Sequence, residues 1–109
     1  MIKHLKIGDI DYILRFKIGI LRHIKELTGQ DPIDFVTNQA GDTFLYVSTV
    51  VNAGIRCQCD AKGDEYPERS LIDRQISANL EVADVKIIVG YLTEFLQAGE
   101  AGSPVQENV

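Results

Sequence analysis

The sequence predicts an α+β domain in which an N-terminal β-hairpin packs on a small bundle of about five helices. Two observations lead to this fold class. Up to Phe16, apolar and polar residues alternate on either side of a glycine turn, as in a hairpin. Beyond Phe16, apolar residues recur at helical spacings of three and four, and Gly or Pro separates these segments. The 109 residues, 45% of them hydrophobic, are enough for one domain with its own core.

The hairpin prediction depends on a two-residue loop, Gly8-Asp9, which suits the twist of paired strands. The loop sets a register with three pairs on one face: Ile7 with Ile10, Leu5 with Tyr12 and Lys3 with Leu14. The apolar face then consists of alternate residues: Leu5, Ile7, Ile10, Tyr12, Leu14 and Phe16. We expect the first and last helices to bury this face, and Lys6 to lie opposite Asp11 on the other face.

Five helices are expected, at residues 17–28, from Pro32 to near Gly41, and at residues 43–61, 70–78 and 81–98. Gly29 is a predicted stop, and Asp31-Pro32 is a predicted cap and first helical residue. Ser70 with Asp73 three residues later resembles a capping box, with Asp in place of the usual Glu.

The segment at residues 43–61 also has the β-branched composition of a strand. We favour a helix because the segment is long, contains no Pro, and keeps helical spacing at Phe44, Val47, Val51 and Ile55. Because this helix is apolar around most of its circumference, we expect it to be the central, buried one.

The predicted globular domain covers residues 1–98, and residues 99–109 form a predicted flexible tail. Gly99 is the expected end of the last helix. Gly102 and Pro104 follow within a small, polar segment that has no apolar periodicity.

The net charge of −5 argues against nucleic acid or an anionic membrane surface as the main partner, because both attract clustered Lys and Arg. No segment approaches the roughly 18 apolar residues of a membrane span, and the first residues lack the apolar core of a signal peptide. We therefore expect a cytoplasmic protein with no nucleic-acid or membrane partner. Five basic residues cluster around the first predicted helix. We interpret them as the solvated face of that helix, and a small basic patch is the alternative: Arg15, Lys17, Arg22, His23 and Lys25.

No pattern of residues in the sequence indicates a catalytic, metal or cofactor site. Cys57 and Cys59 point about 200° apart on a helix, so they neither bridge each other nor share a metal. His4 and His23 stand outside any pattern of nucleophile, base and orienting group. We therefore predict no enzyme activity, no metal and no cofactor.

Apolar residues outside the main helical stripes are the candidate partner-binding surface. These are Leu45 and Tyr46 on the central helix, and Ile87 and Tyr91 on the last helix. Burial in the core is the alternative for each of them.

The order of elements resembles the tail assembly chaperones of long-tailed bacteriophages. The resemblance covers about residues 3–98 and includes RFKIGILRHIKELTGQD, the AGI at Ala53 to Ile55, and LIDRQISANLEVADVKIIVGYLTEFLQAG. Its most telling residues are Phe16, Gly19, Leu21 and Gly29. The resemblance depends on the order of the elements and on the pattern of residue types along them, and it includes no invariant motif.

The resemblance implies a non-enzymatic role in tail morphogenesis. Such chaperones coat the long helical tape measure protein before the tail tube polymerises, help recruit tail tube subunits, and are absent from the finished virion. Many also exist in a longer form, made by ribosomal frameshift, that adds a second domain. The partners implied are the tape measure protein and the tail tube protein, and we expect self-association as well.

Two other classes stay open at this stage. A small cytoplasmic helical adaptor or regulatory protein-binding domain of unrelated origin has the same composition. An enzyme requires a pocket in which His4 or His23 meets a cysteine or a carboxylate with a perturbed pKa.

Overall fold

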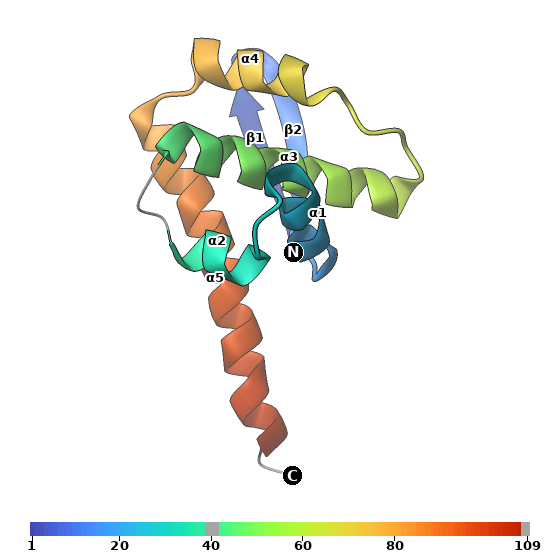
Figure 1. The fold of residues 1–109 in the computed structure, drawn as a ribbon, viewed down its shortest axis with the longest axis vertical. Helices are drawn as coiled ribbons and strands as arrows, with labels where there is room; N and C mark the ends of the chain where they lie inside the picture. The colour runs from blue at the N-terminus through green and yellow to red at the C-terminus, as the bar shows by residue number, and fades with distance from the viewer. Residues whose placement is uncertain (39–41, 108–109) are drawn as a thin grey trace.

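The computed structural model describes the backbone of residues 1–38 and 42–107, and the side chains of these residues up to Ala98. The order of elements is a hairpin followed by helices: β1 (Ile2–Ile7), β2 (Ile10–Arg15), α1 (Gly19–Thr28), α2 (Pro32–Thr37), α3 (Thr43–Lys62), α4 (Arg69–Asn79) and α5 (Val82–Glu107). The predicted α+β class is therefore confirmed (Figure 1).

The hairpin has the predicted register, with Ile7 paired to Ile10 and Lys6 opposite Asp11. Gly8 has a φ of 63°, the left-handed conformation that a Gly-first turn requires. Ile10 was expected on the buried face but is exposed. Helix α4 contacts β1, and its last residue, Asn79, lies beside Gly8 in the turn, whereas Ile10 begins the other strand.

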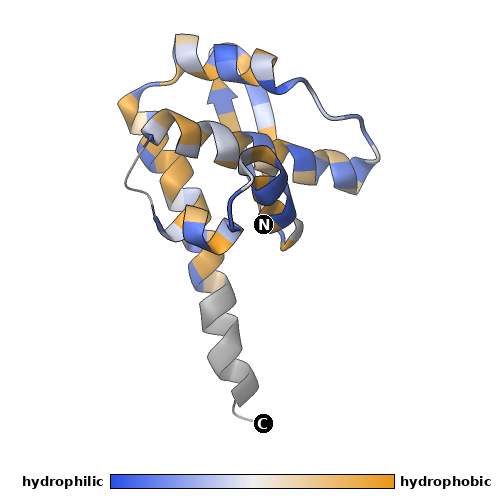
Figure 2. Cartoon of the chain, viewed as in Figure 1, coloured by the Kyte–Doolittle hydropathy of each residue, from blue (hydrophilic) through white to orange (hydrophobic). Residues whose placement is uncertain are grey.

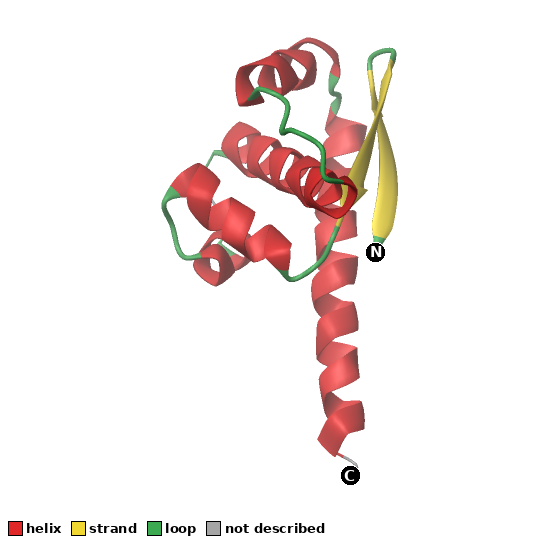
Figure 3. Ribbon diagram, turned by 90° about the vertical axis from the view of Figure 1, so that its right-hand side faces the viewer, coloured by secondary structure: helices red, strands yellow, loops and turns green. Residues whose placement is uncertain are grey.

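Helix α3 is the central helix, as predicted, and it crosses the inner face of the hairpin (Figures 1 and 3). A Cβ added at Gly54 would lie 3.0 Å from Leu14 Cβ, so the missing side chain is what lets α3 approach β2 closely. The expectation that α1 covers the hairpin is therefore wrong: α3 takes that place and α1 packs on α3.

Helix α5 packs against the hairpin, as expected for the last helix, and contacts strand β1. Tyr91 Oη donates a hydrogen bond to the backbone oxygen of His4, and Lys3 Nζ lies 3.2 Å from Glu94 Oε2. The aromatic ring of Phe16, fully buried, lies edge-on to that of Tyr91.

Local signals set the ends of α1 and the start of α2. Gly29 ends α1 with a φ of 72°, and its N–H donates to the backbone oxygen of Lys25. Asp31 caps α2 by accepting hydrogen bonds from the N–H groups of Ile33 and Asp34. Both ends agree with the sequence-based prediction; the expected stop of α2 near Gly41 lies outside the described residues.

The predicted capping box of α4 is wrong. Glu68 occupies the N-cap position, and Ser70 lies inside the first turn. Asp73 accepts hydrogen bonds from Ser48 Oγ at 2.5 Å and Asn52 Nδ2 at 3.1 Å. These two polar side chains of α3 are buried, and burial requires them to find a partner. The carboxylate of Asp73 therefore joins α4 to α3.

The helical backbone of α5 continues to Glu107, past the predicted end at Gly99. A glycine inside a helix costs only about 1 kcal/mol relative to alanine, and a proline about 3 kcal/mol, so these residues disfavour a helix without forbidding it. The C-terminal half of α5 projects away from the other elements (Figure 1). The division into a globular domain of residues 1–98 and a flexible tail stays a prediction.

Candidate partner-binding surfaces

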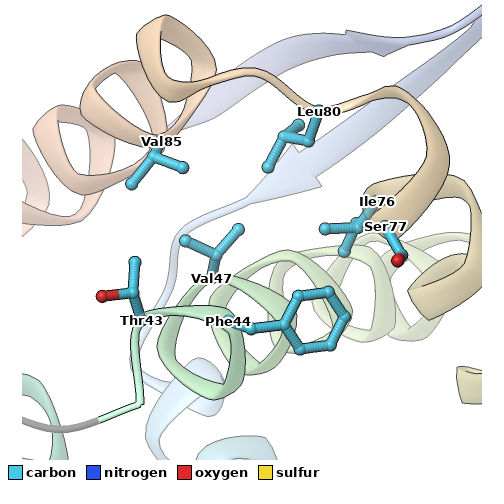
Figure 4. A pocket seen from close by; sticks show the side chains of 7 residues that line it. All are labelled: Thr43, Phe44, Val47, Ile76, Ser77, Leu80 and Val85. Carbon is cyan, nitrogen blue, oxygen red and sulfur yellow. The ribbon is translucent and has the colours of Figure 1, made fainter.

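A pocket of about 260 Å³ opens where the start of α3, the end of α4 and the start of α5 meet (Figure 4). It is lined mainly by apolar side chains: Thr43, Phe44, Val47, Ile76, Ser77, Leu80 and Val85. Phe44 was expected in the buried stripe of α3, but its side chain is 45% exposed. Helical periodicity did not indicate this pocket, because three elements far apart in the sequence build it.

The four residues of the predicted partner surface have different environments. Tyr46 is buried, and its ring stacks on Phe35 with 5.4 Å between ring centroids, so in the free protein it is part of the core. Leu45 is partly buried against the core, and Tyr91 faces the hairpin. Ile87, with 44% exposure, is the member that the free protein presents to a partner.

Ile87 belongs to an exposed outer face on the first half of α5. Ala83, four residues earlier, and Gly90, three residues later, are also exposed on this side, and Lys86 and Glu94 are its charged members. A Cβ added at Gly90 would meet no atom within 4 Å, so the backbone is open to close approach there. Figure 2 shows hydrophobic residues along α3 and the first half of α5, and hydrophilic residues towards the end of α3.

A second cluster joins α1, the end of α3 and the loop that follows it. The imidazole of His23 is fully buried, and its Nε2 lies 2.7 Å from Asp60 Oδ2. Tyr66 donates a hydrogen bond to the other oxygen of Asp60, and its ring packs edge-on against His23. Nδ1 of His23 lies 3.4 Å from Glu26 Oε1 without the geometry of a hydrogen bond.

The electrostatics of this cluster centre on the carboxylate of Asp60. The hydrogen bond from Tyr66, followed by that from His23, lowers the pKa of Asp60 below its ordinary value. The same bond raises the pKa of the Tyr66 phenol, because it stabilises the neutral form. The arrangement therefore stabilises an ionised carboxylate and a neutral phenol.

His23 was expected to be either solvated or structural, and the structure gives it the structural role. Its partner Asp60 is 37 residues away in the sequence, and no local pattern indicated the pair. A histidine beside a carboxylate with a lowered pKa meets one half of the criterion for an enzyme site. The criterion also requires that the two residues lie in a pocket. Neither His23 nor Asp60 lines the pocket between α3, α4 and α5.

The two cysteines are free thiols on α3. Burial, with the charge of Asp60 as a smaller cause, raises the pKa of Cys57 to about 11, so this thiol is protonated at neutral pH. Burial also raises the pKa of Cys59. Within residues 1–38 and 42–98, no group of three or more His, Cys, Asp or Glu side chains is placed to hold a metal ion.

No protein-family model, curated protein or solved structure matches this chain. Among the described residues, no helix combines the length and apolar character needed to cross a membrane.

Proposed function

We propose that this protein is a tail assembly chaperone that coats a tape measure protein and helps to recruit tail tube subunits in the host cytoplasm, without catalysing a reaction. The proposal combines the resemblance in element order with the outer face of α5. That face is the observation that carries it, because a long helical partner needs an accessible helix to lie against.

The outer face of α5 has the properties that side-by-side helix contact requires. Ile87 supplies exposed apolar area, and Gly90 allows the backbone of a second helix to come close. From Ala83 to Glu94 this face covers 12 residues, or about 18 Å at 1.5 Å per residue, so it offers about three turns of contact. A tape measure helix rich in apolar residues would bury Ile87 and its neighbours.

Co-purification tests the proposal directly. The chain is expressed together with the long, helix-rich protein encoded by the adjacent downstream gene, and the complex is isolated through a tag on that protein. We expect the wild-type chain to be retained, and Ile87→Glu to be retained far less because a charge replaces the apolar contact. Purified tail tube protein added to the complex should also bind.

A matched control distinguishes the loss of a binding surface from a general effect of adding a charge or lowering stability. Leu71 on α4 is 54% exposed and is also a large apolar residue, so Leu71→Glu makes the same chemical change on another element. Both variants should unfold at the wild-type temperature. If the wild-type chain does not co-purify, the chaperone proposal is wrong; if Ile87→Glu binds as well as Leu71→Glu, the outer face of α5 is the wrong surface.

A further inference from the structure

The fold has an open apolar pocket and, on another element, an exposed apolar side chain that its own molecule does not cover. Ile18, at the start of α1, is 78% exposed, the highest value for a large hydrophobic side chain among the described residues. It contributes nothing to the core of its own molecule. The apolar pocket between α3, α4 and α5 is on a different part of the fold and is open to solvent.

Basic side chains surround Ile18. Lys17 precedes it, and Arg22 and Lys25 follow at four and seven residues, which places them on the same face of α1. All three are exposed, and Glu26, also exposed, is the acidic exception beside them on α1. Arg22 pairs with Asp60 at 3.3 Å, but the Arg22 side chain is mostly exposed, and a surface ion pair of this kind contributes little to stability.

Acidic residues are sequence neighbours of the residues that line the pocket. Asp42 precedes Thr43, Glu81 follows Leu80 and Asp84 precedes Val85, each next to a lining residue; Lys86 is the basic exception. Two of these carboxylates are held at helix starts: Asp42 accepts a hydrogen bond from the N–H of Leu45, and Asp84 accepts one from the N–H of Glu81. Their positions are therefore fixed beside the pocket.

We propose that the pocket receives Ile18 of a second copy of this chain, with Lys17, Arg22 and Lys25 of that copy facing the acidic residues beside the pocket. Donor and receptor are different surfaces, so the contact is head-to-tail. Each molecule carries both surfaces, and successive contacts build an open chain of subunits. The apolar contact supplies burial, and the charges set its orientation.

Two substitutions remove the two halves of this contact. Ile18→Glu removes the donor and Phe44→Glu places a charge at the mouth of the receptor. Both positions are at helix starts, where a negative charge suits the helix dipole, so both variants should fold. Ile33 provides a matched control: like Phe44 it follows an Asp N-cap by two residues, and it is 50% exposed.

Sedimentation velocity over a wide concentration range at low salt measures the association. The wild-type chain and Ile33→Glu should form species of increasing mass, and added salt should weaken them. Ile18→Glu and Phe44→Glu should each stay monomeric. Mixed together they should form a dimer and nothing larger, because one variant retains the pocket and the other retains Ile18.

Each other outcome overturns the proposal. These are a wild-type chain that stays monomeric, either variant associating like the wild type, Ile33→Glu losing association, or a mixture of the two variants that remains monomeric. Circular dichroism and thermal unfolding of every variant exclude misfolding as the cause. The result does not depend on the tape measure protein, so the chaperone proposal succeeds or fails separately.

Discussion

The contact between Gly54 and Leu14 predicts opposite effects for the same substitution at two helical glycines. At Gly54, an added Cβ lies 3.0 Å from Leu14 Cβ and 3.5 Å from Leu14 Cα. Carbon atoms pack best at about 3.5–4.0 Å, so the new methyl group is too close. Leu14 Cβ is bonded directly to the backbone of β2, and a rotamer change cannot move it away. Helix α3 or strand β2 must therefore shift.

Gly90 is the matched position, because it lies inside α5 and an added Cβ there meets no atom within 4 Å. Alanine in place of glycine stabilises a helix by about 1 kcal/mol at either position. At Gly54 an overpacking cost of about 1–3 kcal/mol opposes this gain. The difference between the two variants isolates the overpacking cost, since the helix propensities cancel.

We therefore expect Gly90→Ala to raise the free energy of unfolding, and Gly54→Ala to leave it unchanged or lower it by up to about 2 kcal/mol. For a domain of this size, 1 kcal/mol corresponds to roughly 4–8 °C in melting temperature. Thermal and urea unfolding measure both variants. The reasoning is refuted if Gly54→Ala is as stable as Gly90→Ala.

Three further predictions concern the core, the Asp60 cluster and the C-terminal segment. Leu14→Asp buries a charge at a fully buried position and should cost several kcal/mol of a total that is about 5–15; wild-type thermal stability would contradict the position of Leu14. Asp60 has a lowered pKa, so its contribution to stability is present above the ordinary Asp pKa and is lost as the pH falls through the lowered value. The raised pKa of Tyr66 has the opposite sense: its contribution is present below the ordinary Tyr pKa and is lost as the pH rises through the raised value. In an NMR titration, Tyr66→Phe should move the pKa of Asp60 up towards its ordinary value, and an unchanged pKa would show that the phenol is not the main cause. Deleting residues 101–109 should leave the melting temperature unchanged, and a large drop would show that this segment supports the fold.

The features that could be predicted from the sequence are those with a local physical cause. The two-residue turn at Gly8-Asp9 fixes the register of the whole hairpin, because loop length and turn type decide which residues of the two strands are paired. Gly29 and Asp31 end one helix and begin the next through hydrogen bonds to their own neighbours. Length and spacing were enough to identify α3 as a helix despite its β-branched residues.

The features that could not be predicted depend on contacts between distant segments. The sequence places Asp73 in a local capping box, but its carboxylate instead accepts hydrogen bonds from the buried side chains of Ser48 and Asn52. Helical spacing places Tyr46 outside the main apolar stripe and so predicts an exposed side chain, but Phe35 of α2 stacks on its ring and helps to bury it. The same limitation explains why neither the His23 cluster nor the pocket had a signal in the sequence.

The two proposed surfaces predict how coating would depend on partner length. Val85 lines the pocket and Ile87 lies on the outer face of α5; two positions apart on a helix, they point about 200° apart. A chain of subunits joined through Ile18 therefore leaves each α5 face free for the tape measure protein. Many weak contacts to one long helix then act together, because each bound subunit raises the local concentration of the next.

The Ile18→Glu variant distinguishes cooperative binding of neighbouring subunits from the contact that one subunit makes with the tape measure helix. On a short helical fragment of the tape measure protein, with room for one subunit, Ile18→Glu should bind with the wild-type Kd. On the full-length tape measure protein, it should bind more weakly than the wild-type chain, which gains from contacts between neighbouring subunits. Isothermal titration with the fragment and co-sedimentation with the full-length protein measure the two cases. Equal losses on both partners would place Ile18 in the tape-measure contact itself, and equal binding to both would show that the subunits coat the helix independently of one another.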